Sequence, residues 1–317
     1  MPSRPPGFGD PAARPPEEAP LAELEEVLPF SFARPAEALA ESISRVGLLR
    51  PLLVQREGPR LKLLAGNLRR RALQILGRKA APAVFLPPAA PDALALALAD
   101  NLERPVNPAE RALVWRRLVE TLGPAEAEKL AGFLGLDQAP KLRGRNFQAA
   151  ALPPRGLLAL AEGRLDLAAA ARLAGWAPAD RDAALDLFER LNPSLSNRRL
   201  WLDWLEDLAR REGQSPAQIL AAPGFNPSPA SAAEAGDRLF RQRHPLLAEL
   251  RQKRADRLRA LNSPPGARFT ADPGFEDLSF SLTLTFAGLE EFRRLAAWLN
   301  GLPARAEFQA LLDDSRD

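Results

Sequence analysis

The sequence predicts an α+β protein that is mostly helical and has three folded parts. Over about the first hundred residues, short apolar segments alternate with short amphipathic helices, which is typical of a small α/β domain. Short helices bounded by Gly, Pro or Asn then follow one another, which predicts an all-α domain. Near the C-terminus, one strongly alternating strand precedes an amphipathic helix, which predicts a small α/β unit.

Changes in composition set the expected boundaries of these parts. Residues 1–20 are rich in Pro, Gly and Ala and contain no hydrophobic segment, which predicts a disordered tail rather than a secretory signal. The α/β domain is expected at 21–105, the all-α domain at 106–222, a linker with a charged helix at 223–264, and the C-terminal unit at 265–317.

The first domain is expected to contain three helices and four strands. The pattern predicts a strand at 27–32, a helix at 35–47, strands at 48–55 and 61–66, a helix at 68–77, a strand at 81–86 and a helix that ends near residue 104.

The second domain begins with the best-marked helix of the sequence. Asn107 is placed to cap it, with Pro108 at its first position and Glu110 at its third. Its apolar stripe, Val114, Trp115, Leu118 and Leu122, predicts a face turned to the core.

A helix-turn-helix is one of two interpretations of the stretch that follows. Residues 128–136 read as a first helix, and a second contains Arg, Asn and Gln, which recognise guanine and adenine edges in the major groove. Candidate base contacts are Arg143, Arg145, Asn146 and Gln148, with Lys141 as a phosphate contact. The other interpretation is an ordinary helical hairpin.

A basic turn between a strand and a helix, residues 65–72, is a candidate anion site. Gly66 lets the backbone approach a ligand, and Arg69 and Arg71 are placed to bind phosphate beside the free amides of the helix N-terminus. Arg70 is expected to point away, to the surface. The alternative is a solvated helix start.

Two further polar residues precede a helix boundary. Asp100 and Asn101 offer the oxygen ligands that Mg²⁺ prefers, and the alternative is an exposed helix end.

Composition excludes several kinds of chemistry. The chain has no cysteine and a single histidine, which rules out thiol catalysis, cysteine-held metal sites and multi-histidine sites built from one chain. No apolar run reaches the roughly 18 residues that span a bilayer. We therefore expect a cytoplasmic protein without a membrane partner.

Four segments, in this order along the chain, together resemble the ParB family of partition proteins. They are "ISRVGLLRPLLVQ" (43–55), "LLAGNLRRRAL" (63–73), "ADNLERPVNPAERA" (99–112) and "ALPPRGLLALAEGRLDLAAAARLAG" (151–175). The resemblance covers roughly residues 22–175 and strengthens the helix-turn-helix interpretation.

The resemblance implies a function. It implies a sulfiredoxin-like N-terminal domain that binds CTP and Mg²⁺, a central domain that binds a palindromic centromere-like site on double-stranded DNA, and a C-terminal domain that forms a homodimer. It further implies a nucleoid-associated protein that CTP closes into a clamp on DNA, with a ParA-type ATPase as partner.

The chain departs from the family pattern in the nucleotide box. The family's Glu–Arg pair is Asn67–Leu68 here, its Gln is Arg50, and its Glu is Asp100, whereas Asn101, Arg69 and Arg71 match. The resemblance thus implies a CTP site of Gly66, Asn67, Arg69, Arg71, Arg50 and Asn101 with reduced affinity, and at most weak CTPase activity. Two other functions stay open: a transcription regulator without nucleotide turnover, and a nuclease or kinase on the same N-terminal fold.

The C-terminal unit predicts self-association. A lone strand and one helix cannot cover their own apolar faces. A two-fold pairing of residues 275–300 is expected to cover Leu282, Leu284, Phe286, Phe292 and Leu295.

Overall fold

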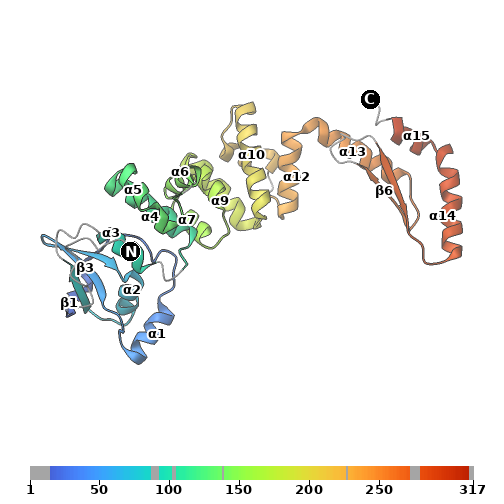
Figure 1. Cartoon of the computed structure of the whole chain (residues 1–317). Coiled ribbons are helices and arrows are strands. Elements are labelled where there is room, and N and C mark those ends of the chain that lie inside the picture. The colour runs from blue at the N-terminus through green and yellow to red at the C-terminus, as the bar shows by residue number, and fades with distance from the viewer. Residues whose placement is uncertain are drawn as a thin grey trace. The chain divides into compact units, whose positions relative to one another are not determined.

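The computed structural model describes residues 15–86, 93–101, 105–137, 139–225, 228–271 and 279–313 (Figure 1). The chain divides into two compact units. The first comprises Met1–Asp186 and Ser194–Arg198, and the second Leu187–Pro193 and Arg199–Asp317. Among the described residues, no helix is both long enough and apolar enough to cross a membrane.

The first unit begins with a five-stranded mixed sheet in the order β1-β5-β3-β4-β2. Its strands are β1 (Glu17–Pro20), β2 (Leu24–Glu26), β3 (Leu52–Glu57), β4 (Arg60–Ala65) and β5 (Ala80–Leu86). β3 pairs antiparallel with β4 and parallel with β5, β1 pairs antiparallel with β5, and β2 pairs parallel with β4. Helices α1 (Glu37–Val46) and α2 (Asn67–Ile75) pack against each other. These elements confirm the mixed α/β prediction for this part of the chain.

Two predictions for the start of the chain are wrong. The expected tail includes residues 17–20, but these form β1, because their backbone pairs with β5 and Ala19 is fully buried. The strand expected at 27–32 is instead β2, three residues earlier, followed by turns. Leu28 and Phe30 supply the apolar pattern because they are buried in the core without being in a strand. Residues 1–14 of the expected tail lie outside the described residues.

Helices complete the first unit around α4. They are α3 (Ala93–Asp100), α4 (Pro108–Leu122), α5 (Pro124–Lys129), a 3-10 turn η3 (Ala131–Leu134), α6 (Pro140–Ala149), α7 (Pro154–Ala161) and α8 (Leu167–Ala174). The predicted capping box of α4 is confirmed: Asn107 Oδ1 accepts from the Glu110 amide, and Glu110 Oε2 accepts from the Asn107 amide. Val114, Trp115 and Leu118 are buried, as the stripe predicted.

One continuous core joins the sheet to these helices. Leu28, Phe30, Leu64 and Leu86 from the sheet region pack in the same cluster as buried residues of α3, α4 and η3. Helices α3 and α4 and the turn η3 therefore share one core with part of the sheet region.

A buried ion pair strengthens this junction. The Glu110 carboxylate is 0% exposed and accepts from Arg34 Nε at 2.7 Å and Nη2 at 2.8 Å. Asn107 Nδ2 also donates to the Phe32 carbonyl at 3.1 Å. The hydrogen bond to Glu110 raises the pKa of Arg34 above its ordinary value, so the guanidinium stays charged.

Helices α9 (Pro178–Leu191) and α10 (Leu195–Glu212) contribute residues to both units. The second unit continues with α11 (Pro216–Ala221), η4 (Pro223–Phe225), α12 (Ala232–Arg243), α13 (Pro245–Ala260), β6 (Ala267–Ala271), β7 (Phe280–Leu284), α14 (Leu289–Gly301), η5 (Leu302–Ala304) and α15 (Ala306–Asp313). The single charged helix expected at 223–264 is two helices, because Pro245 has no amide hydrogen and starts α13 afresh.

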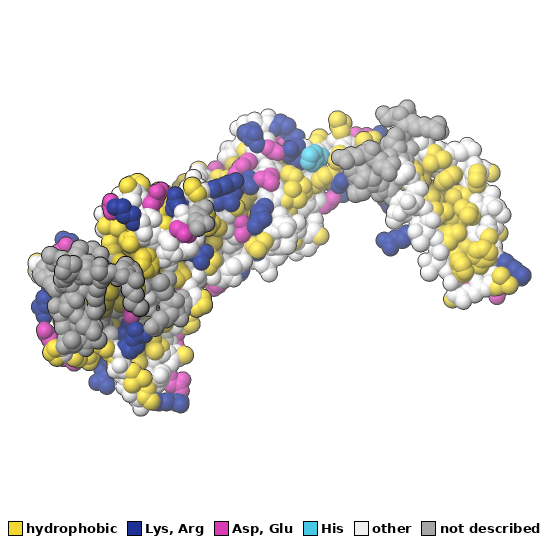
Figure 2. Space-filling view, in the orientation of Figure 1, with side chains coloured by type: hydrophobic (Ala, Val, Ile, Leu, Met, Phe, Trp, Pro, Cys, Tyr) yellow, Lys and Arg dark blue, Asp and Glu magenta, His cyan; other side chains and the backbone are white. Residues whose placement is uncertain are grey.

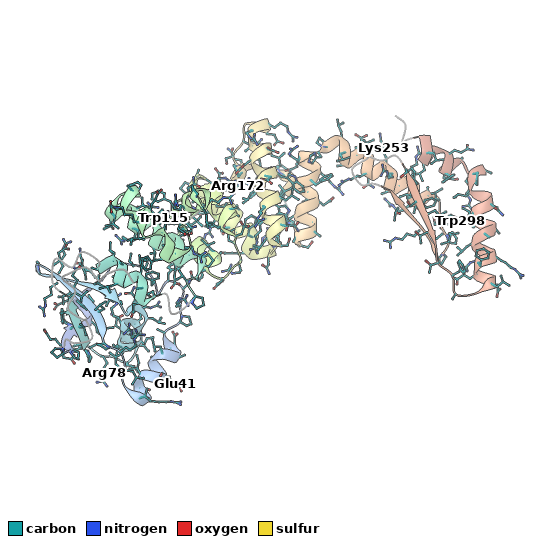
Figure 3. All side chains as sticks on the ribbon, viewed as in Figure 1. Glu41, Arg78, Trp115, Arg172, Lys253 and Trp298 are labelled. Atoms are coloured by element: carbon teal, nitrogen blue, oxygen red, sulfur yellow. The ribbon has the colours of Figure 1, made fainter. Side chains whose placement is uncertain are left out.

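The predicted C-terminal strand is β7, and it pairs antiparallel with β6, a strand that the sequence pattern did not indicate. Leu261, Leu302 and Leu311 form a small core with partly buried aromatic residues, which include Phe269 and Trp298. Trp298 is labelled in Figure 3. Phe269 and Trp298 contact edge to face, with ring centroids 6.3 Å apart. The hairpin and its helices thus have a core of their own.

Candidate functional site

A cavity of about 360 Å³ lies at the N-terminus of α2. It is lined by Phe30, Leu39, Arg50, Gly66, Asn67, Leu68, Arg69, Asp100 and Asn101. Six of the seven residues predicted for nucleotide and metal binding therefore meet at one place, although they come from three separate stretches of sequence. The exception is Arg71, which is not among the residues that line the cavity.

Gly66 connects β4 to α2 in a conformation that other residues rarely adopt. Its φ is +103°, and no side chain caps the helix that it starts. A Cβ at this position would lie 2.7 Å from Leu52 Cδ2 and 3.3 Å from Arg69 Nε. The glycine is thus required by the chain's own packing, and it leaves the first amides of α2 uncovered by a capping side chain.

Two arginines share one carboxylate in the cavity. Asp100 Oδ2 lies 3.1 Å from Arg69 Nη2, and Asp100 Oδ1 lies 3.2 Å from Arg50 Nη2. Arg69 Nη1 also donates to the carbonyls of Arg50, at 3.0 Å, and Pro51, at 2.6 Å. Backbone acceptors therefore fix the Arg69 guanidinium, which presents its other nitrogen to the cavity.

The arrangement does not fit the predicted Mg²⁺ site. Mg²⁺ is usually held by one or two carboxylates together with water or substrate phosphates. Among the described residues that line the cavity, Asp100 is the only acid, and both of its oxygens face guanidinium groups. Asn101 Nδ2 donates to the Ala97 carbonyl at 2.8 Å. No group of three or more His, Cys, Asp or Glu side chains with metal-binding geometry occurs within the described ranges.

Asn67, which stands where the family has Glu, is hydrogen-bonded to Glu26, a residue that sequence reasoning missed. Its Nδ2 donates to Glu26 Oε1 at 2.5 Å and to the Leu28 carbonyl at 2.6 Å. Burial raises the pKa of Glu26, against the opposing effects of Arg70, Arg71 and the Ser31 side chain. Nothing in the sequence pairs Glu26 with Asn67, because 41 residues separate them.

The two other arginines of the basic turn brace the surrounding backbone. Arg70 was expected at the surface, but it is largely buried, and Nη1 donates to the Leu24 carbonyl at 2.6 Å. Arg71 Nη1 donates to the Ser31 carbonyl at 2.8 Å, and Arg71 is not among the residues that line the cavity. The prediction that Arg70 is a surface residue is therefore wrong, whereas the assignment of Arg71 as a phosphate contact stays a prediction.

The candidate helix-turn-helix differs in part from its prediction. The first helix expected at 128–136 is broken: α5 ends at Lys129, η3 follows, and Gly135 is left-handed with φ +66°. The second helix is α6 and contains all five predicted DNA contacts.

Packing divides those five residues between two faces of α6. Asn146 is 1% exposed and its Nδ2 donates to the Leu142 carbonyl, so the prediction that it reads a base is wrong. Arg143 donates to the carbonyls of Leu136 and Asp137 and pairs with Glu128 at 3.1 Å, which ties α6 to the preceding turn. Lys141, Arg145 and Gln148 follow at i, i+4 and i+7 on one side of the helix, where Lys141 and Gln148 are exposed and Arg145 is partly exposed.

Large apolar side chains are exposed on the second unit. Phe286, Leu289, Phe292 and Leu299, which we term the C-terminal apolar surface, are 49, 63, 43 and 38% exposed. Figure 2 shows hydrophobic side chains gathered on this part of the chain. Leu295 is fully buried within its own unit, so the prediction that a partner covers it is wrong.

Comparison with known proteins gives one family. Residues 32–102 match the ParB N-terminal domain. The chain is 44% identical over 100 residues to a probable plasmid-partitioning protein ParB of Thermus thermophilus, which covers 31% of this chain and 33% of that protein. It is 34% identical over 194 residues to the chromosome-partitioning protein Spo0J of the same organism, which covers 61% of this chain and 66% of that protein. The matches thus span less than two thirds of either relative.

A solved structure also matches. It is the C-terminally truncated chromosome-partitioning protein ParB of Caulobacter crescentus complexed with CTP-gamma-S, at 26% identity over 54% of this chain and 97% of that chain. The TM-score of 0.25 is too low to support an inference from the superposition. The sequence matches agree with the predicted order of motifs: the chain carries a ParB N-terminal domain and is similar to ParB-family partition proteins.

Proposed function

We propose that this chain is a DNA-binding partition protein whose N-terminal domain binds CTP and whose C-terminal unit holds two copies together. The observation that carries the proposal is the cavity at the start of α2, where two arginines and an uncapped helix N-terminus meet. Such a place suits the phosphates of a nucleotide, because amide dipoles and guanidinium groups both favour negative charge.

The expected affinity for CTP is lower than that of a site with the family's full set of charges. Leu68 lines the cavity where the family has an arginine, and it has no group to donate to a phosphate. One lost charge-assisted hydrogen bond weakens binding by about 1.5–3 kcal/mol. Arg50 contributes a positive charge from the adjacent loop and offsets part of this loss.

Replacing Arg69 by alanine is expected to weaken CTP binding by about 1.5–3 kcal/mol, roughly 10- to 150-fold, because it removes the anchored guanidinium. Titration calorimetry with CTP, and with ATP and GTP for base selectivity, measures the loss. Arg45→Ala is the matched control, since Arg45 is an exposed arginine of α1 that pairs with Glu41 outside the cavity lining. Wild-type protein that binds no CTP at millimolar nucleotide and Mg²⁺, with cognate DNA present, would contradict the proposed nucleotide site.

We further propose that α6 recognises one half of a palindromic DNA site in each copy of the chain. Arg145 and Gln148 are the candidate base contacts and Lys141 is the phosphate contact, because these side chains lie on one side of the helix and are exposed or partly exposed. Arg143 is a positioning residue on this account. A palindrome requires two copies of α6, which a two-fold dimer supplies.

Arg145→Ala is expected to cost about 1–3 kcal/mol of specific binding and to relax sequence preference, whereas Lys141→Ala weakens all sequences alike and reduces the salt dependence. Fluorescence anisotropy separates these effects. It is measured at two salt concentrations, with a duplex that contains the site found by genome-wide occupancy mapping and with a scrambled duplex. A genome-wide occupancy map without a focal site, or an unchanged map for Arg145→Ala, would remove α6 from the proposal.

A ParB-like transcription regulator without nucleotide turnover is the second candidate. Leu68 favours it, because an apolar side chain occupies part of the phosphate cavity. A nearby gene for a ParA-type ATPase would favour partition over regulation. A nuclease or kinase is less well supported, since the one acid among the described lining residues is bonded to two arginines.

A further inference from the structure

The Asp100 carboxylate stands where a ligand phosphate would meet the two arginines of the cavity. We infer that Asp100 is an internal anion that competes with the ligand for Arg50 and Arg69, and not a metal ligand. This inference rests on the proposed nucleotide site and concerns how that site is regulated. A polyphosphate must displace Asp100 before both guanidinium groups can bind it.

The Asp100 carboxylate binds Arg50 and Arg69 in the way that a phosphate group would bind them. Each carboxylate oxygen takes a different guanidinium group, at 3.2 Å for Arg50 and 3.1 Å for Arg69, so one anion bridges two cations. Guanidinium groups bind carboxylates and phosphates through the same N–H donors. Asp100 and Arg69 are 24 and 17% exposed at their side chains, so solvent and salt screen their attraction less than that of a surface pair.

Asp100 occupies a place that is unfavourable for an acid unless cations face it. It is the last residue of α3, where the helix dipole presents its negative end. The two arginines compensate for this repulsion. When they turn to a ligand, Asp100 loses its stabilising partners and is free to move away from the cavity with the end of the helix.

Arg69 does not have to move when the exchange takes place. Its Nη1 remains on the carbonyls of Arg50 and Pro51, and only Nη2 changes its acceptor from Asp100 to the phosphate. Arg50 has a side chain that is 59% exposed and can follow the ligand. The barrier to binding is thus the electrostatic attraction that holds Asp100 to the two arginines, whereas the Arg69 guanidinium is already in place.

The test compares Asp100→Asn with wild type by titration calorimetry at fixed ionic strength. The probes are CTP and inorganic triphosphate, each in EDTA and in Mg²⁺. Removing the anion that pairs with the partly buried Arg69 and the exposed Arg50 is expected to tighten binding of both probes in EDTA by about tenfold. Glu41→Gln is the matched control, because it removes one negative charge from an exposed pair on α1 (Figure 3) and is expected to change affinity less than twofold.

The outcomes separate the inference from the function on which it rests. Asp100→Asn that binds triphosphate no tighter than wild type in EDTA, or that only loses Mg²⁺-dependent binding, would overturn the inference. Tighter triphosphate binding, with CTP bound no more tightly than triphosphate by either protein, would uphold it and remove the proposed CTP function. Absence of binding by both proteins to both probes would overturn both. Asp100→Ala, which also removes the competing charge, serves if Asp100→Asn does not fold.

Discussion

Replacing Arg34 by methionine is expected to lower the free energy of unfolding by about 3 kcal/mol, at the lower end of the ~3–5 kcal/mol range for breaking a buried ion pair. The substitution removes the Arg34 guanidinium from a Glu110 carboxylate that is fully buried and also accepts from the Asn107 amide. Arg34 itself is a quarter exposed, which lets water replace part of what is lost. Urea denaturation followed by circular dichroism measures the change.

Arg45→Met is the control for this experiment. It removes the same kind of side chain from an ion pair whose two members are exposed on α1, and such pairs contribute about 0–1 kcal/mol. A loss for Arg34→Met no greater than that for Arg45→Met would mean that the buried pair contributes nothing to the junction between the sheet and α4.

Introducing aspartate at both Leu289 and Phe292 is expected to convert the proposed dimer to a monomer. Burial of each of these side chains contributes about 1.5–3 kcal/mol, and a two-fold interface contains each of them twice. Both residues lie outside the small core of the second unit, so the fold is expected to survive the change. Light scattering without DNA or nucleotide measures the mass.

The point variants test the dimer contact more specifically than a deletion of residues 265–317, which would also disrupt the core of the second unit. That deletion removes Leu302 and Leu311 and leaves Leu261, their partner in the core, exposed. Leu246→Asp is the matched control, because Leu246 is a highly exposed leucine of α13 outside the C-terminal apolar surface. A double variant that remains dimeric would place the dimer contact elsewhere.

Sequence motifs only a few residues long correctly predicted the structural elements that are determined by residues adjacent in the chain. The capping box of α4 is complete within four residues, and the glycine between β4 and α2 follows from one strand and one helix that are adjacent in sequence. The mostly helical α+β class follows from the same periodicities. β6 escaped prediction because it is short and gains its stability from pairing with β7.

Side-chain roles depended on packing that the sequence does not state. Helical spacing placed Asn146 and Arg145 in the same helix, but contact of α6 with α4 and α8 decides that one is buried and the other is not. Arg70 and Arg71 hold the backbone of distant segments, because each donates a hydrogen bond to a carbonyl about 40 residues or more away in sequence. Asp100 was correctly placed beside the basic turn, whereas its two arginine partners could not be inferred from spacing.

The continuous core between the sheet and α4 has a consequence for how this protein can be divided. The match to the ParB N-terminal domain ends at residue 102, but Leu28, Phe30 and Leu64 pack in the same cluster as Val114, Trp115 and Leu118. A fragment that stops at the end of the match would expose a large apolar face to water and lose cooperative folding. The segment that matches the ParB N-terminal domain is therefore smaller than the segment that packs as one core, and expression fragments built on it must carry α4 as well.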